Sequence, residues 1–311
     1  MRNIDEINKA LQAFFKLEPN NLQPLTGGTN NKVYRVRVGS DNLVVKSYAE
    51  AINSKDRLFK EYNFLLLCQD NNINNVPKIK FIDNDLIIIC ETYISGTKIS
   101  SSTYYIEAMI NFISSLNSNI PIDAVTFNAT DAIFSSEDLL ESIAERVSNV
   151  QSDLSHDKYL KENYKVLFNL LVRDEEKNQS IKNFFTKFSR RVISPSDLGP
   201  ENILYSDEPF FIDFEYSGLD SNIKIALDIV TRPSINFEKF SNNQIEKLFL
   251  EVMGFKIGSI PLSLVQIFKL KWILIEYSSI LKREIEFSKN DLDLRINNYN
   301  VAVMEMIKNF T

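Results

Sequence analysis

The chain has 311 residues, of which 44% are hydrophobic and 24% are charged, and its formal net charge is −6. This length and composition predict a globular protein of about two domains or lobes. Basic residues never gather in a cluster of five or more, which argues against a nucleic-acid groove. The first residues lack the apolar core of a signal peptide, and no apolar run approaches the ~18 residues of a membrane span. We therefore expect a cytoplasmic protein without nucleic-acid or membrane partners.

Histidine and cysteine usage narrows the chemistry further. His156 is the single histidine and lies in a polar stretch, so we interpret it as a surface residue. Serine-histidine-aspartate hydrolysis and histidine-rich metal centres are therefore disfavoured. Cys68 and Cys90 lie inside the apolar runs "FLLLC" and "LIIIC", which favours buried free thiols over a disulfide or a metal site.

Residues 3–16 have helical periodicity, and residues 34–38 alternate between apolar and basic side chains as a strand does. A turn at 39–42 leads into a second strand, "NLVVKSY". Helical periodicity returns in residues 54–70, with Asn53 or Ser54 as the N-cap.

Residues 76–93 predict two strands around a turn at 83–85. From about residue 101 the pattern is mainly helical, except for the stretch 192–220. The break at Ser95-Gly96 separates a strand-rich domain, residues 1–92, from a helix-rich domain, residues 93–311.

The exceptional stretch reads "VISPSDLGPENILYSDEPFFIDFEYSGLD". A loop with Asp197 and Asn202, followed by a hairpin ending at Asp213, supplies the groups that phosphoryl transfer requires. One carboxylate takes the proton of an attacking hydroxyl, and an amide oxygen and a second carboxylate hold Mg²⁺. The turn at 206–209 would fold Asp213 back beside Asn202.

Two upstream features fit the same chemistry. Lys46 lies in the strand "NLVVK" and Glu61 on the following helix, as in kinases whose lysine grips the inner phosphates of ATP. Between two strands, "LTGGTNN" could turn backbone N–H groups toward phosphate oxygens, although a Gly-Gly pair there often marks only a hairpin. The sequence contains no Walker A loop.

Taken together, these motifs resemble the aminoglycoside phosphotransferase and choline kinase superfamily of small-molecule kinases, which share the protein-kinase fold. The resemblance extends from about residue 22 to about residue 285. It is close in "GGTNNKVYRV", "VVK", "DRLFKEYNFL", "SPSDLGPENIL" and "FFIDFEYSGLD", and "LKWILIEYS" is similar to the substrate-lobe helix of bacterial members.

The resemblance implies an α+β, two-lobed protein-kinase-like fold, with an antiparallel sheet and one helix in an N-terminal nucleotide-binding lobe and a mainly helical C-terminal catalytic lobe. It implies that Asp197 is the catalytic aspartate and that Asn202 and Asp213 bind Mg²⁺. Asp228 would brace the catalytic loop. The implied contacts with ATP or GTP come from a phosphate loop, an ion pair and a hinge segment: Gly27, Gly28, Thr29 and Asn30; Lys46 and Glu61; Glu91, Tyr93 and Ile94.

One motif departs from the family pattern. Members usually carry H-G-D or H-N-D at the catalytic aspartate, whereas this chain reads Pro195-Ser196-Asp197. In the family the histidine supports the loop and is not the base, so its loss is compatible with activity. It also leaves open an alternative, a nucleotide-binding pseudokinase with a regulatory role.

The acceptor is a small-molecule hydroxyl, and two classes stay open. One is a sugar or amino sugar of the aminoglycoside type. The alternative is an amino alcohol such as choline or ethanolamine, whose ammonium group could be enclosed by acidic and aromatic residues: Glu215, Tyr216, Trp272 and Glu276. The sequence does not decide between ATP and GTP, nor does it fix the oligomeric state.

Overall fold

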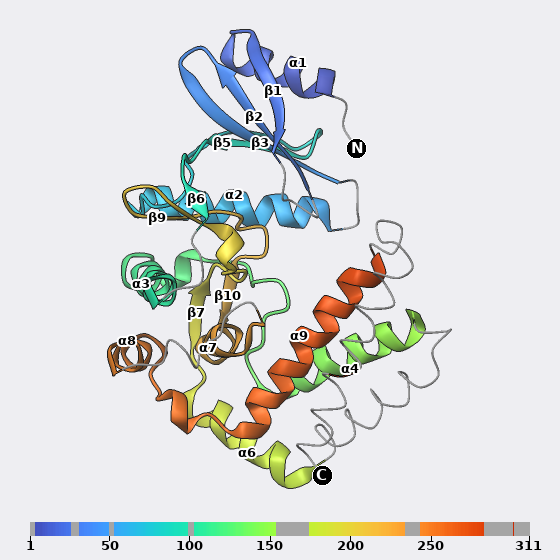
Figure 1. The fold of residues 1–311 in the computed structure, drawn as a ribbon, viewed down its shortest axis with the longest axis vertical. Coiled ribbons are helices and arrows are strands. Elements are labelled where there is room, and N and C mark those ends of the chain that lie inside the picture. The colour runs from blue at the N-terminus through green and yellow to red at the C-terminus, as the bar shows by residue number, and fades with distance from the viewer. Residues whose placement is uncertain are drawn as a thin grey trace. The chain divides into compact units, whose positions relative to one another are not determined.

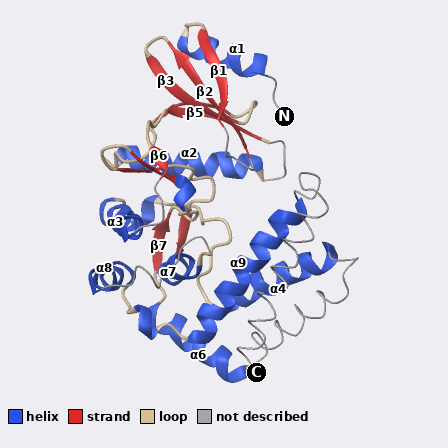
Figure 2. Ribbon diagram, in the orientation of Figure 1, coloured by secondary structure: helices blue, strands red, loops and turns tan. Residues whose placement is uncertain are grey.

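The chain folds into an antiparallel sheet near its start and mainly helices afterwards, which is the α+β class expected from the sequence (Figure 1). The structure is a computed structural model. It describes residues 4–25, 31–49, 53–98, 103–153, 174–233, 243–282 and 301. Within these ranges the strands gather in the N-terminal part and around residues 191–221 (Figure 2).

Five antiparallel strands form the main sheet in the order β1-β2-β3-β5-β4. Their bounds are β1 (Pro19–Leu25), β2 (Asn31–Val38), β3 (Asp41–Tyr48), β4 (Ile79–Asp83) and β5 (Ile88–Thr92). The expected strands and the turn after Asp83 are therefore present. In β2 the alternation holds, because Tyr34, Val36 and Val38 are buried on one face.

Helix α1 (Ile4–Phe15) packs on one face of this sheet. Its Ile7 and Leu11 are fully buried in a cluster with Leu43 and Val45 of β3. Burying each of these side chains contributes on the order of 2 kcal/mol. Successive strand residues point to opposite faces, so Lys46 lies on the other face from Val45.

Helix α2 (Ser54–Asp70) begins where the sequence predicted. Asn53 occupies its N-cap position, but the side chain makes no capping hydrogen bond. Cys68 of this helix and Cys90 of β5 are buried and free, as expected. Burial raises the pKa of the Cys68 thiol to about 12, so the thiol stays protonated at neutral pH.

The chain divides into two compact units, and the division differs from a boundary after residue 92. Unit 1 comprises Met1–Thr130 with Val192–Leu219, and unit 2 comprises Asp131–Arg191 with Asp220–Thr311. Unit 1 therefore holds the main sheet and most of the stretch that carries the phosphoryl-transfer motif. The assignment of separate nucleotide-binding and catalytic lobes stays a prediction.

Unit 1 also contains α3 (Thr103–Asn119), a 3-10 turn (Ile122–Ala124) and a three-stranded sheet of order β6-β8-β9. The strands are β6 (Thr97–Lys98), β8 (Ile203–Tyr205) and β9 (Pro209–Phe211), and β8 and β9 form the expected hairpin. Two of the boundaries between the units, at 191/192 and at 219/220, fall inside strands that pair with each other. These strands are β7 (Arg191–Ser194) and β10 (Gly218–Ser221).

The described part of unit 2 is helical. It contains α4 (Ser136–Asp153), α6 (Glu175–Phe188), α7 (Asn222–Thr231), α8 (Asn243–Met253), a 3-10 turn (Ile257–Ser259) and α9 (Leu262–Lys282). α9 is apolar on nearly every side and contacts α4, α6 and α7, as expected of a buried helix. No helix that the structure describes, in either unit, has the length and apolarity needed to cross a bilayer.

Candidate active site

Lys46 is surrounded by three carboxylates on the face of the main sheet opposite α1. It forms an ion pair with Glu61 of α2, and its Nζ lies 3.3 Å from Glu91 Oε1 and 3.6 Å from Asp213 Oδ1. The structure thus brings together two expected partners, Lys46 and Glu61. The side chain of Glu91 is an addition, because only the backbone of its segment was expected to take part.

A tyrosine fixes the other oxygen of Glu61. The Tyr48 hydroxyl donates to Glu61 Oε2, while Oε1 accepts from Lys46 and from the backbone N–H of Phe214 at 3.3 Å. Tyr48 and Lys46 lie two residues apart on β3, so they share one face of the sheet. Both oxygens of the buried Glu61 are therefore satisfied.

The charge balance of this cluster is negative. Burial alone would lower the pKa of Lys46, but Glu61, Glu91 and Asp213 raise it well above its usual value. Burial raises the pKa of Glu91 to about 7, although Lys46 opposes the shift. One ammonium group thus faces three carboxylates, so a further cation would offset the excess of negative charge.

Asp197 and Asn202 lie on a short loop between β7 and β8. The Asn202 side-chain amide donates to the Asp197 carbonyl oxygen at 3.0 Å, which turns Asn202 Oδ1 away from that carbonyl. The Asn202 carbonyl accepts from the Ile212 N–H at 3.0 Å. This last bond brings the residue before Asp213 against Asn202, as the predicted hairpin requires.

Asp213 follows β9 in the left-handed region, with φ of 71°, and Ser196 has φ of 65° directly before Asp197. Non-glycine residues rarely adopt such angles, at a cost of about 1–2 kcal/mol, and they concentrate at functional sites. The Asp213 side chain keeps 38% of its surface exposed, so a ligand can reach it. Partial burial, together with Glu61, Glu215 and Asp197, raises its pKa to about 7 against the effect of Lys46.

These residues fit Mg²⁺, the metal that the resemblance implies. An amide oxygen and a carboxylate are hard ligands of the kind that Mg²⁺ prefers. No residue that the structure describes donates a hydrogen bond to Asn202 Oδ1. Burial and neighbouring carboxylates raise the pKa of Asp213 despite Lys46, so a further cation beside it would favour its ionised form. Asn202 and Asp213 would therefore hold the ion.

The expected hinge, Glu91 to Ile94, contributes differently along its length. The Tyr93 N–H donates to the Asn42 carbonyl at 3.0 Å, so this donor is used within the sheet. The Arg35 guanidinium lies over the Tyr93 ring, with Arg35 Cζ 4.1 Å from the ring centroid. Ile94 is the second residue after the end of β5 and is in no strand. Its backbone contact with a nucleotide base stays a prediction.

Glu215 and Tyr216 were expected to enclose an acceptor's ammonium group. The structure instead holds Glu215 against Arg57, with distances of 3.2 and 3.3 Å from Nη1 to its two oxygens, and against the Asn31 side-chain amide. Tyr216 is partly buried, and burial beside Glu215 raises the pKa of its phenol. The Glu215 charge is thus already paired within unit 1.

Trp272 and Glu276 lie on α9 in unit 2, and the structure does not describe the Glu276 side chain. The Arg232 guanidinium lies over the Trp272 ring, 4.9 Å from its centroid. A protein cation therefore already covers this aromatic face.

Asp228 of α7 binds two lysines of its own unit. Its carboxylate accepts from Lys224 and Lys271, each at 2.9 Å. Although burial would raise the pKa of Asp228, the two lysines lower it to about 2. A bracing contact with the catalytic loop stays a prediction.

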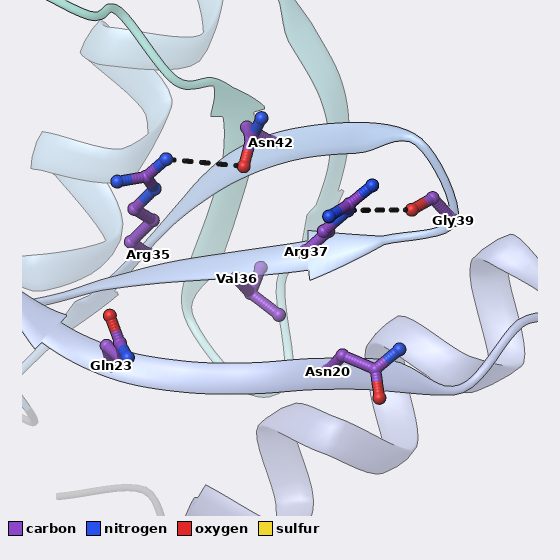
Figure 3. Close-up of a pocket in the computed structure, with 7 residues that line it drawn as sticks. All are labelled: Asn20, Gln23, Arg35, Val36, Arg37, Gly39 and Asn42. Atoms are coloured by element: carbon purple, nitrogen blue, oxygen red, sulfur yellow. Dashed lines mark hydrogen bonds between the residues drawn. The ribbon is translucent and has the colours of Figure 1, made fainter.

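A hollow of about 660 Å³ lies along β1, β2 and β3, and none of the residues that line it was predicted to belong to the site (Figure 3). Arg35 donates to Asn42 Oδ1 at 3.4 Å, and Arg37 donates to the Gly39 carbonyl at 3.2 Å (Figure 3). Both guanidinium groups therefore have partners near the β2–β3 turn, and we assign no ligand to this hollow.

Five residues with predicted roles lie outside the described part of the chain: Gly27, Gly28, Thr29, Asn30 and His156. The sequence did not predict the contacts made by three side chains: Tyr48, Arg57 and Glu91. The signal for Glu91 was a charged residue at an inward position of the apolar strand "LIIICETY".

No protein-family model matches the sequence, and no curated protein does. Solved structures do match. The choline kinase LicA from Streptococcus pneumoniae has a TM-score of 0.63 at 17% identity, over 98% of both chains. The chain has the fold of such kinases. The streptomycin–ATP complex of APH(2")-IIa has a TM-score of 0.62 at 14% identity, over 99% of both chains. Spectinomycin phosphotransferase APH(9)-Ia with ADP and spectinomycin gives 0.61 at 14%, over 99% of this chain and 98% of the other.

Proposed function

We propose that this chain is a small-molecule kinase that transfers the γ-phosphoryl group of ATP or GTP to a hydroxyl group. The observation that carries the proposal is the joining of two loops through Asn202. Asn202 bonds the Asp197 carbonyl on one side and the N–H before Asp213 on the other, and Asp213 lies 3.6 Å from Lys46. The fold that the chain shares with a choline kinase and a spectinomycin phosphotransferase supports it.

In this proposal Asp197 orients the acceptor hydroxyl and accepts its proton while the oxygen forms a bond to the γ-phosphorus. The bond between that phosphorus and the β–γ bridging oxygen breaks, and the nucleoside diphosphate leaves. Lys46, oriented by Glu61, binds the inner phosphates. Bound by Asn202 and Asp213, Mg²⁺ would neutralise charge on the phosphates. Orientation and charge neutralisation by these residues supply most of the acceleration.

We propose a sugar or amino-sugar hydroxyl as the acceptor, in preference to choline or ethanolamine. A site for an ammonium group needs unpaired carboxylates and open aromatic faces. Glu215 is paired with Arg57, and the Trp272 face is covered by Arg232. These contacts disfavour an ammonium site made from the residues first expected to form one.

Release of ADP or GDP in the presence of Mg²⁺ tests both parts of the proposal. The acceptor panel contains hexoses, heptoses, amino sugars, aminoglycosides, choline and ethanolamine. Stimulation by a sugar that is lost in Asp197→Ala supports the proposed reaction. Stimulation by choline alone would overturn the acceptor class. Nucleotide binding without stimulation by any member favours the pseudokinase alternative.

A further inference from the structure

One face of α2 contacts the segment that follows Asp213. Arg57, Glu61 and Phe64 are spaced i, i+4 and i+7, so they lie on one side of the helix. Phe64 stacks on the Phe214 ring with centroids 4.7 Å apart, and Glu61 accepts from the Phe214 N–H. Arg57 completes the row through Glu215.

Glu215 also connects this segment to the start of β2. Its carboxylate accepts from the Asn31 amide in addition to Arg57, and the residue is only 2% exposed. The Arg57 guanidinium lies 5.6 Å from the centroid of the Tyr48 ring, whose hydroxyl donates to Glu61. Arg57 therefore contacts both Glu215 and the tyrosine that orients Glu61.

These contacts with α2 restrain the backbone on the C-terminal side of Asp213, which has a φ of 71°. A left-handed non-glycine residue persists only where its surroundings hold it. Upstream, the Ile212 N–H is bonded to Asn202; downstream, Phe214 and Glu215 are bonded to α2. A buried ion pair contributes little net stability relative to apolar side chains of similar size. We therefore interpret the Arg57–Glu215 pair by its effect on the orientation of the segment after Asp213.

We propose that Arg57 and Asn31 are positioning residues, which act through Glu215 to hold Asp213 in the backbone conformation that presents its carboxylate to Mg²⁺. This inference rests on the proposed function. It assigns Glu215 to the protein's own framework, and no acceptor contact is needed to explain its burial.

Binding of a fluorescent ATP analogue, N-methylanthraniloyl-ATP, tests the proposal when it is measured in EDTA and in a Mg²⁺ titration. Arg57→Met should leave the affinity in EDTA within about twofold of wild type. It should raise the Mg²⁺ concentration for half-maximal enhancement of binding by about tenfold or more, as loss of outer-shell support does at other metal sites. Arg57→Lys, which keeps the charge, should recover part of this loss. Asn31→Asp, which sets a carboxylate against Glu215, should also weaken the Mg²⁺ effect.

Lys60→Met is the matched control, because Lys60 is another largely buried cation of α2 and bonds Thr130 at 2.9 Å and Asp56 at 2.9 Å. It should lower the melting temperature without changing the Mg²⁺ dependence. An unchanged Mg²⁺ dependence in both Arg57 variants would overturn the inference, and so would an equal change in Lys60→Met. If wild type itself binds the analogue without any Mg²⁺ effect, the proposed function fails first.

Discussion

Asn202 donates its side-chain amide to the backbone carbonyl of Asp197 at 3.0 Å, so the orientation of one candidate metal ligand depends on the loop of the candidate base. An amide has one donor side and one acceptor side. Using the donor side on Asp197 leaves Oδ1 as the side that can face a cation.

Asn202→Asp should abolish this orientation, because a carboxylate cannot donate to the carbonyl and is repelled by it. We expect Mg²⁺-supported turnover to fall by about 10- to 100-fold. The control is Asn119→Asp, the same substitution at an exposed amide of α3 that bonds Ser115. Turnover that survives in Asn202→Asp with its normal Mg²⁺ dependence would contradict the assigned role.

Glu91→Gln should stabilise the nucleotide-free protein at high pH. Burial raises the pKa of Glu91 to about 7, so between about pH 4.5 and 7 the folded state binds more protons than the unfolded state. Stability then falls as pH rises through this window, because ionised Glu91 is disfavoured when folded. The variant should exceed wild type by roughly 2–3 kcal/mol at pH 8 and by little at pH 5. Urea unfolding in EDTA at the two pH values measures this, and equal gains at both would count against it.

Lys46→Met should have the opposite effect on the same cluster. It removes the cation that lowers the pKa of Glu91 and Asp213, so burial and mutual repulsion favour the protonated forms of these two groups more strongly. Stability should therefore decline more steeply than in wild type as pH rises from 5 to 8. Nucleotide affinity should fall by about tenfold or more, since the phosphates lose a charged partner. An unaltered pH slope would show that Lys46 does not hold these carboxylates.

Substitutions at Ser196 test whether the strained backbone before Asp197 matters for stability and turnover. Its φ of 65° suits glycine and opposes β-branched residues. Ser196→Gly should keep turnover near wild type, whereas Ser196→Val should destabilise the protein by about 1–3 kcal/mol and reduce turnover by displacing Asp197. Thermal unfolding combined with turnover would distinguish the two variants, and a fully active Ser196→Val would rule out the constraint.

Gly218 should be among the least replaceable residues of unit 1. A Cβ there would lie 2.5 Å from the backbone N of Ala129 and the backbone C of Asn128, at a φ of 146°. Gly218→Ala should cost about 3 kcal/mol or more, because backbone atoms must move. Gly258→Ala is the control, since a Cβ at that position meets nothing within 4 Å. Similar melting temperatures for the two variants would be inconsistent with this packing.

Local patterns predicted the elements that depend on neighbouring residues. The alternation in β2, the helical periodicity of α1 and α2, and the hairpin that returns Ile212 to Asn202 are all encoded within short stretches. The pairing of Lys46 with Glu61 was also predicted, because kinases place a lysine on a strand and its glutamate partner on the helix that follows.

Other contacts join residues that are distant in sequence, and no local pattern contains them. Arg57 and Glu215 are separated by 158 residues, so their pairing was invisible and Glu215 was expected to serve an acceptor. The inward direction of Glu91 depends on how β5 pairs with β3, which places it beside Val44 and near Lys46. The grouping of α3 with the N-terminal sheet likewise depends on long-range packing.

The central claim is tested most directly by following the γ-phosphoryl group itself. ATP labelled with ³²P in the γ position is incubated with Mg²⁺ and the stimulating sugar, using wild type and Asp197→Ala, and nucleotide binding is measured in parallel. We expect label on the sugar with wild type and at least about 100-fold less with Asp197→Ala, at similar nucleotide affinity. Equal transfer by both proteins, or binding without transfer by wild type to any acceptor, would contradict it.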